Sequence, residues 1–132
     1  MLPGAADFEA AARSGDLLVA EFDGELVGFV QTKQLDGCLH VVQVTVAPTA
    51  QRQGIGRRLM IAVEQRAIAR GFAKMTLTTF RDVPFNGPFY RRLGWREIDD
   101  EELSAGLRAE REEEAAAGLD HWPRVAMAKV LV

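Results

Sequence analysis

The chain has 132 residues, a length typical of one domain, so we expect residues 1–132 to form a single folded unit. Hydrophobic residues make up 48% of the chain and charged residues 27%, which is ordinary for a globular protein. The formal net charge of −3 argues against a nucleic-acid partner, because binding to a polyanion needs a basic surface.

A single cysteine, Cys38, excludes an internal disulfide and is typical of a reducing, cytoplasmic setting. The first eight residues have neither a basic start nor a long apolar run, so they do not resemble a secretory signal. No segment approaches the ~20 apolar residues that a membrane span needs. We therefore expect a soluble cytoplasmic protein without membrane contact.

Turn signals and hydrophobic periodicity divide the chain into strands and helices. Asp-Gly pairs at 23–24 and 36–37 are typical of two-residue hairpins and predict three antiparallel strands. Apolar residues at helical spacing from Ile55, ended by Gly71, predict a helix. The predicted elements in chain order are a helix at 5–13, strands at 17–22, 25–34 and 39–46, a helix at 55–70, a strand at 74–80, a helix at 87–93 ended by Gly94, a strand at 95–98, a helix at 99–117 and a strand at 124–132.

This order predicts an α+β fold, with one mixed, mostly antiparallel sheet and helices on its faces. The helix at 99–117 is rich in charge, with a cap expected at Asp99 or Asp100 and a narrow apolar stripe from Leu103 and Leu107. We expect this helix to be mostly exposed to solvent. Its acidic run at 110–114 has an alternative interpretation as a lid that attracts a cationic amine.

The turn Gln51–Gly56 (Q-R-Q-G-I-G) has the features of a phosphate-binding loop. A helix N-terminus leaves about four amide N–H groups without partners, and its dipole favours an anion. The turn lacks the Lys-Ser/Thr pair of a nucleotide P-loop, and Leu59 stands where a dinucleotide-binding loop has its third glycine. For this hexapeptide alone, a glycine-rich turn that simply begins a helix is the alternative.

The strand end V-T-V-A-P, followed by Q-R-Q-G-I-G-R-R-L, resembles the acetyl-coenzyme A (acetyl-CoA) loop of the GNAT superfamily of N-acetyltransferases. The resemblance implies that loop amides and the helix N-terminus hold the coenzyme pyrophosphate. It also implies that the preceding strand splays from its neighbour and leaves main-chain groups for the pantetheine arm. The positions implied are Val44, Thr45 and Val46 for the arm, and Gln51, Arg52, Gln53, Gly54, Ile55, Gly56 and Arg57 for the pyrophosphate.

A second motif at 84–95, P-F-N-G-P-F-Y-R-R-L-G-W, resembles the GNAT segment in which an Asn contacts the coenzyme and a Tyr lies near its sulfur. The matching residues are Asn86 and Tyr90, which are four positions apart and therefore share one face of a helix. Trp95 stands where the family commonly has Phe. A tyrosine in this context alone is more often a core residue, so the assignment of Tyr90 depends on the two motifs occurring together.

Acyl transfer from a thioester to an amine requires a proton at the sulfur and the loss of one from the amine. A phenol with a pKa near ~10 can protonate the thiolate, so Tyr90 is the candidate general acid, and a strand amide near Val44 would stabilise the carbonyl oxygen. For the amine, the chain offers Gln43, which would orient a water, or His40, whose ordinary pKa suits a base. Strand alternation predicts that these two side chains lie on opposite faces. Transfer without a base, from an amine that arrives neutral, stays open.

The two motifs together predict a GNAT-like N-acetyltransferase that uses acetyl-CoA as co-substrate, with no metal, and a small-molecule or peptide amine as acceptor. The alternative is a coenzyme A-binding module of the same fold without catalysis, such as a sensor or assembly partner. The family fold usually begins with a strand and one or two helices, but about fifteen residues precede Leu17, so we expect shortened N-terminal elements. A sheet edge left uncovered in this way would favour a homodimer.

Overall fold

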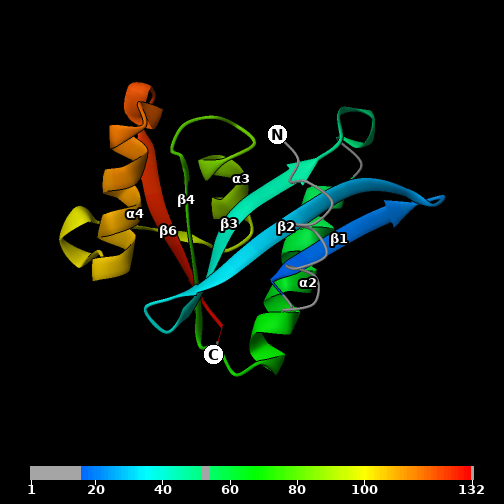
Figure 1. Cartoon of the computed structure of the whole chain (residues 1–132), viewed down its shortest axis with the longest axis horizontal. Coiled ribbons are helices and arrows are strands. Elements are labelled where there is room, and N and C mark those ends of the chain that lie inside the picture. Colours follow the sequence, from blue (N-terminus) through cyan, green and yellow to red (C-terminus); the bar gives the residue numbers. More distant parts are fainter. Residues whose placement is uncertain (1–15, 52–53, 132) are drawn as a thin grey trace.

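A six-stranded mixed sheet forms the centre of the computed structural model, which describes residues 16–51 and 54–131 (Figure 1). The strands lie in the order β1-β2-β3-β4-β6-β5. Neighbouring strands are antiparallel except β3 and β4, which are parallel. The strand bounds are Leu17–Phe22 (β1), Glu25–Leu35 (β2), Cys38–Val46 (β3), Lys74–Phe80 (β4), Arg96–Ile98 (β5) and Arg124–Val130 (β6).

Three α-helices within the described ranges cover the two faces of this sheet: α2 (Ile55–Ala69), α3 (Gly87–Arg92) and α4 (Ala105–Ala116). The buried side of α2 packs in one core with Met127 of β6, whereas Leu107 of α4 packs with Ala126 and Ala128. Since successive strand residues point to opposite faces, α2 and α4 lie on opposite sides of the sheet. The α+β class and the mixed, mostly antiparallel sheet are therefore confirmed. No helix in the described ranges is long and apolar enough to cross a membrane.

Both Asp-Gly turns form hairpins, as predicted. The φ angles are 52° and 79° at Asp23 and Gly24, and 53° and 78° at Asp36 and Gly37. Two consecutive positive φ angles are typical of the type I′ turn, whose twist matches that of the flanking strands. The predicted helix at 5–13, and with it the expected shortening of the N-terminal elements, lies outside the described residues.

The region predicted as one helix at 99–117 is divided. A 3-10 turn at Asp100–Glu102 comes first, and α4 then begins after Ser104, whose Oγ accepts the Leu107 N–H at 3.4 Å. The predicted caps at Asp99 or Asp100 are therefore wrong. Asp36 of the β2–β3 hairpin accepts hydrogen bonds from the Ser104 hydroxyl and, at 2.8 Å, from the Gly106 N–H. The start of α4 is therefore held by a contact with the β2–β3 hairpin. This contact is distant in sequence, because Asp36 is 68 residues from Ser104.

Candidate active site

The parallel pairing of β3 and β4 is short, and the two strands then diverge (Figure 1). Both strands are described in full, and three residue pairs join them, the last being Val41 and Leu77. Beyond this pair, β3 continues to Val46 against β2, and β4 continues to Phe80 against β6. The facing edges of β3 and β4 are therefore free of ladder partners there, which is the splay that the resemblance implied.

The register with β2 sets which main-chain groups of β3 face this divergence. The Ala47 N–H donates to the Val27 carbonyl at 2.8 Å, so residue 47 faces β2. Residues of an antiparallel ladder alternate between bonding the partner strand and pointing away from it. Val44 and Val46 therefore direct their main-chain N–H and C=O groups toward the side of β4. The Val46 carbonyl accepts the Gln51 side-chain amide at 3.4 Å, and the Val44 groups lie at the diverging edge.

The turn into α2 presents main-chain N–H groups to an anion. Gly54 is the N-cap, and the first hydrogen bond of the helix joins the Arg58 N–H to the Gly54 carbonyl at 3.1 Å. The amides of residues 55–57 therefore precede the intrahelical ladder. The first turn contains no acidic side chain, and both Arg57 and Arg58 are exposed. The charge and the dipole at this helix start both favour a bound phosphate.

The two glycine positions of this turn differ in whether another residue can replace glycine there. Gly54 has a φ of 75°, a left-handed conformation that strains other L-residues. A Cβ at Gly56 would lie 3.8 Å from Val46 and 3.9 Å from Phe89, which is ordinary van der Waals contact. Position 56 therefore has room for alanine, whereas position 54 favours glycine through its backbone. Two predicted loop residues lie outside the described part of the chain: Arg52 and Gln53.

Tyr90 lies in the core of the α2 face and is 8% exposed. Its ring packs edge to face against Phe89 and Trp95, at centroid distances of 5.2 and 6.0 Å. Burial raises the pKa of the Tyr90 phenol to about 12. In the described part of the chain, the hydroxyl makes no hydrogen bond, and no fully buried side-chain oxygen or nitrogen is left unpaired. The hydroxyl must therefore reach accessible space, as a neutral donor.

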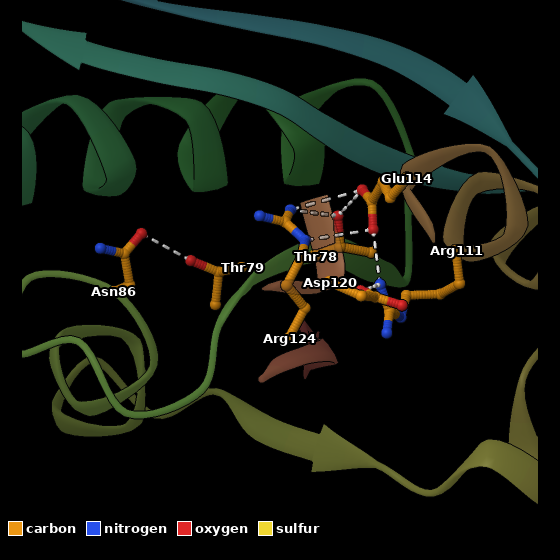
Figure 2. A network of polar contacts seen from close by, with 7 residues as sticks. All are labelled: Thr78, Thr79, Asn86, Arg111, Glu114, Asp120 and Arg124. Carbon is orange, nitrogen blue, oxygen red and sulfur yellow. Dashed lines mark hydrogen bonds and ion pairs between the residues drawn. The ribbon is translucent and has the colours of Figure 1, made fainter. Parts of the chain in front are cut away.

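Asn86 is the N-cap residue of α3, but its side chain accepts no hydrogen bond from the helix. Figure 2 shows its Oδ1 accepting a hydrogen bond from the Thr79 hydroxyl of β4, at 2.8 Å. The Asn86 carbonyl accepts the Tyr90 N–H at 2.9 Å, so the two predicted residues are joined within one helical turn.

A β-bulge at Val42 overturns the predicted orientation of His40 and Gln43. Val41 and Gln43 pair with successive residues of β2, so Val42 is an extra residue in β3. Val41 and Val44 both pack in the core on the α2 face, which leaves His40 and Gln43 together on the other face. The prediction of opposite faces is wrong because the bulge interrupts the alternation on which it relied.

His40 is a buried residue within the paired part of β3. It is 3% exposed, and its Nδ1 lies 2.9 Å from the Thr76 Oγ1. Burial lowers the pKa of His40; the charges of Glu110 and Glu114 on α4 raise it, and that of Lys33 lowers it, by smaller amounts. The imidazole is therefore neutral, and it lies under α4 rather than at the diverging edge.

Gln43 lies beyond the paired segment, directly before Val44. Its Nε2 donates to the Thr45 Oγ1 at 3.2 Å, which orients the carboxamide and leaves Oε1 as an acceptor. The main chain of Thr45 faces β2 in the register, so Thr45 does not present its backbone to the diverging edge. Of the two proposed proton-handling residues, Gln43 is the one beside the diverging edge.

A polar network that the sequence did not predict ties α4 to the sheet (Figure 2). Glu114 accepts the Thr78 hydroxyl of β4, the Arg124 guanidinium of β6 at 3.3 Å and the Arg111 guanidinium at 2.9 Å. Arg111 also pairs with Asp120 at 3.0 Å. The Glu114 side chain is 15% exposed, so this network replaces water on the inner side of α4.

The acidic run is therefore not a single solvated face. Glu110 pairs with Lys33 of β2, whereas Glu112 and Glu113 are exposed. The lid interpretation then rests on Glu112 and Glu113 alone, because basic residues of the sheet and of α4 neutralise the two inner carboxylates. Helical spacing continued from Leu103 and Leu107 reaches positions 110 and 114. The sequence therefore contained a signal that these two residues lie on the inner face of the helix.

A cleft of about 720 Å³ lies away from this site, between β1 and the first half of α2. Its lining includes Val19, Ala20, Ile55 and Leu59 but no residue of β3, β4 or α3. It therefore lacks both the diverging strand edge and Tyr90, and we assign it no role in the predicted chemistry.

A family model described as the acetyltransferase (GNAT) family matches residues 3–95. A Danio rerio protein described as probable N-acetyltransferase 14 is 29% identical over 126 residues, which are 94% of this chain and 44% of that protein. The chain thus spans less than half the length of this relative.

Several solved structures share the fold. Rv2747 from Mycobacterium tuberculosis, in complex with CoA, has a TM-score of 0.71 and 21% identity, over 98% of this chain and 83% of that one. The ribosomal-protein-S18-alanine N-acetyltransferase of Escherichia coli has a TM-score of 0.68 and 19% identity, over 98% and 79%. The N-acetylglutamate synthase of Neisseria gonorrhoeae, complexed with CoA and N-acetyl-glutamate, has a TM-score of 0.70 and 18% identity, over 97% and 32%. Because the family model covers most of its length, this chain belongs to the acetyltransferase (GNAT) family.

Proposed function

We propose that this chain is an acetyl-CoA-dependent N-acetyltransferase, which moves the acetyl group of acetyl-CoA to an amine. The observation that carries this proposal is the divergence of β3 and β4 next to the uncapped N-terminus of α2. That arrangement offers main-chain donors for a diphosphate and, along β3, for an arm that contains amide groups. Structural neighbours that were solved with CoA support the same assignment.

In this proposal, the chain holds the coenzyme at three places. The N–H groups of residues 55–57, with Arg57 and the loop residues from Gln51, hold the diphosphate. The edge of β3 from Val44 to Val46 binds the arm, and Asn86 contacts it from α3. No metal is required by this scheme, because main-chain dipoles and arginines supply the positive potential.

Val44 and Tyr90 act on the thioester in this scheme. The Val44 N–H stabilises the carbonyl oxygen as charge develops on it. Tyr90 donates its hydroxyl hydrogen to the sulfur as the carbon–sulfur bond breaks. The Tyr90 phenolate then takes a proton from solvent, so that overall the amine loses one proton and the sulfur gains one. Gln43 accepts a hydrogen bond from the amine or from a water that carries its proton away.

The absence of a carboxylate on β3 favours an acceptor whose amine is neutral in a substantial fraction near neutral pH. A peptide α-amine has a pKa near ~7.7–8.0, whereas a lysine side chain has a pKa near ~10.4 and is almost wholly protonated at neutral pH. Gln43 cannot remove a proton from the lysine ammonium. We therefore infer that a peptide or small-molecule amine of low pKa is the preferred acceptor. One neighbour is named for an alanine of a ribosomal protein, which fits this class.

The assembly and location of the protein are also part of the proposal. In the described chain, β1 is an edge strand that pairs with β2 alone, so we propose a homodimer formed at this edge. The lone Cys38 favours the cytoplasm. Light scattering of the purified protein tests the first point, and a monomer mass at all concentrations would contradict it.

The activity test is the release of free thiol from acetyl-CoA in the presence of peptides with free N-terminal amines and of small amines. We expect thiol release that depends on the acceptor and whose kcat/KM follows the pKa of the acceptor amine. Binding of coenzyme A without transfer to any amine would instead indicate a non-catalytic coenzyme-binding module. Failure to bind coenzyme A at millimolar concentration would reject the coenzyme assignment itself.

A further inference from the structure

Asn86 uses its side chain in an unusual way for the N-cap residue of a helix. An Asn at this position normally accepts an N–H from its own first turn. In α3 there is no side-chain cap, and Pro88 in the first turn has no N–H to offer. The Asn86 Oδ1 instead accepts the Thr79 hydroxyl at 2.8 Å (Figure 2). The carboxamide is therefore bonded to β4 and not to its own helix.

Thr79 provides a rigid support for this contact. It is 5% exposed in a strand that pairs with β6, and it points to the same face as Leu77, two residues earlier. A Cβ added at Gly87 would lie 2.2 Å from the Arg81 carbonyl oxygen. The chain just after β4 thus touches the start of α3 directly, which holds the backbone at Asn86 close to the end of β4.

The direction of this hydrogen bond decides what Asn86 presents to the site. Since the hydroxyl donates to Oδ1, the two Nδ2 hydrogens lie at the other end of the carboxamide. We propose, resting on the coenzyme site proposed above, that Thr79 is a positioning residue that fixes Asn86 as a hydrogen-bond donor to a carbonyl oxygen of the coenzyme arm. Thr79 itself does not touch the coenzyme.

Thr79→Val, which keeps the shape but removes the hydroxyl, tests this role. We expect the dissociation constant for coenzyme A, measured by calorimetry, to rise about five- to tenfold, the effect of one lost hydrogen bond. The KM for acetyl-CoA should rise in parallel, while kcat at saturation stays within about twofold. Thr79→Ser restores the hydroxyl and should return both constants to wild-type values.

Asn86→Asp tests the polarity. A carboxylate still accepts from Thr79 but offers no N–H, so this variant should lose at least as much coenzyme affinity as Thr79→Val. Wild-type affinity in Asn86→Asp would mean that position 86 presents an oxygen, and it would overturn the proposal.

Thr78→Val is the matched control, because the neighbouring hydroxyl bonds Glu114 on the opposite face. It should leave coenzyme affinity unchanged, and melting temperatures of all variants identify losses that come from folding alone. Unchanged affinity in Thr79→Val, or no recovery in Thr79→Ser, would reject the inference while leaving the proposed function standing. A wild-type protein that does not bind coenzyme A would reject both.

Discussion

Replacing Tyr90 by Phe should reduce kcat about a hundredfold without weakening the fold. The side chain is 8% exposed, and its ring contacts to Phe89 and Trp95 survive the change. General acids contribute roughly 10²–10⁴-fold to rate. The pKa of about 12 makes this phenol a weaker acid than a thiol of pKa ~8.5, so the lower end of that range applies. A hundredfold loss corresponds to about 2.7 kcal/mol of transition-state stabilisation.

Thiol release under saturating acetyl-CoA measures this effect, with calorimetry of coenzyme A and thermal melts alongside it. Because the hydroxyl has no hydrogen-bond partner among the described residues, stability should change by less than about 1 kcal/mol. Trp95→Phe is the matched control, since it removes packing from the same cluster and should lower stability more than kcat. A Tyr90→Phe rate within threefold of wild type would refute the general-acid role. An alkaline loss of rate below about pH 10 that this variant abolishes would instead contradict the pKa of about 12, because Tyr90 would then titrate too early.

Three further predictions follow from the loop, the helix cap and the polar network. Gly54→Ala should cost about 1 kcal/mol of stability and weaken coenzyme A binding in calorimetry, because of its φ of 75°; Gly56→Ala should affect both little, and equal effects would contradict this. Hydrogen bonding from Ser104 lowers the pKa of Asp36, so its stabilisation holds above the ordinary value of 3.8 and is lost as pH falls through the folded-state pKa. The stability difference between wild type and Asp36→Asn in denaturant titrations should therefore shrink from pH 6 to pH 2, and a constant difference would count against the cap. Glu114→Gln should destabilise the fold by about 1–3 kcal/mol, because the adjoining guanidinium groups lose their anion, yet leave coenzyme A affinity unchanged; unaltered melting would show that the network contributes little.

Most element boundaries were predictable because local hydrogen bonds and turn conformations define them. The Asp-Gly turns predicted both hairpins, and β4 spans the predicted residues 74–80. Gly71 and Gly94 both have positive φ after helices, as their positions indicated. Each of these signals is complete within a few residues, so no distant partner could change it.

The features that sequence reasoning missed depend on distant partners. The segment V-V-Q-V-T-V favours a strand at every position, so nothing local marks Val42 as the extra residue, and only the register with β2 does so. The start of α4 depends on Asp36, and its inner polar face depends on contacts with β2, β4 and β6. From the sequence alone, charged residues are expected on the solvent-exposed surface, because their partners lie far away along the chain.

In the candidate site too, local motifs were recognisable from the sequence, whereas features that depend on distant contacts were not. The two motifs predicted roles for Val44, Asn86 and Tyr90; in the structure, Val44 lies beyond the β3–β4 pairing, and Asn86 and Tyr90 are joined in one turn of α3. They did not indicate Thr79, since K-M-T-L-T-T-F reads as an ordinary strand. They also gave the wrong relation between His40 and Gln43, because the bulge changed the alternation.

The most direct test of the whole account is a crystal structure of the protein with coenzyme A. The account predicts diphosphate oxygens within hydrogen-bond distance of the N–H groups of residues 55–57. It also predicts that the arm lies along β3 at Val44, with the sulfur near the Tyr90 hydroxyl. Coenzyme bound instead in the cleft between β1 and α2, or no bound coenzyme at millimolar concentration, would contradict it.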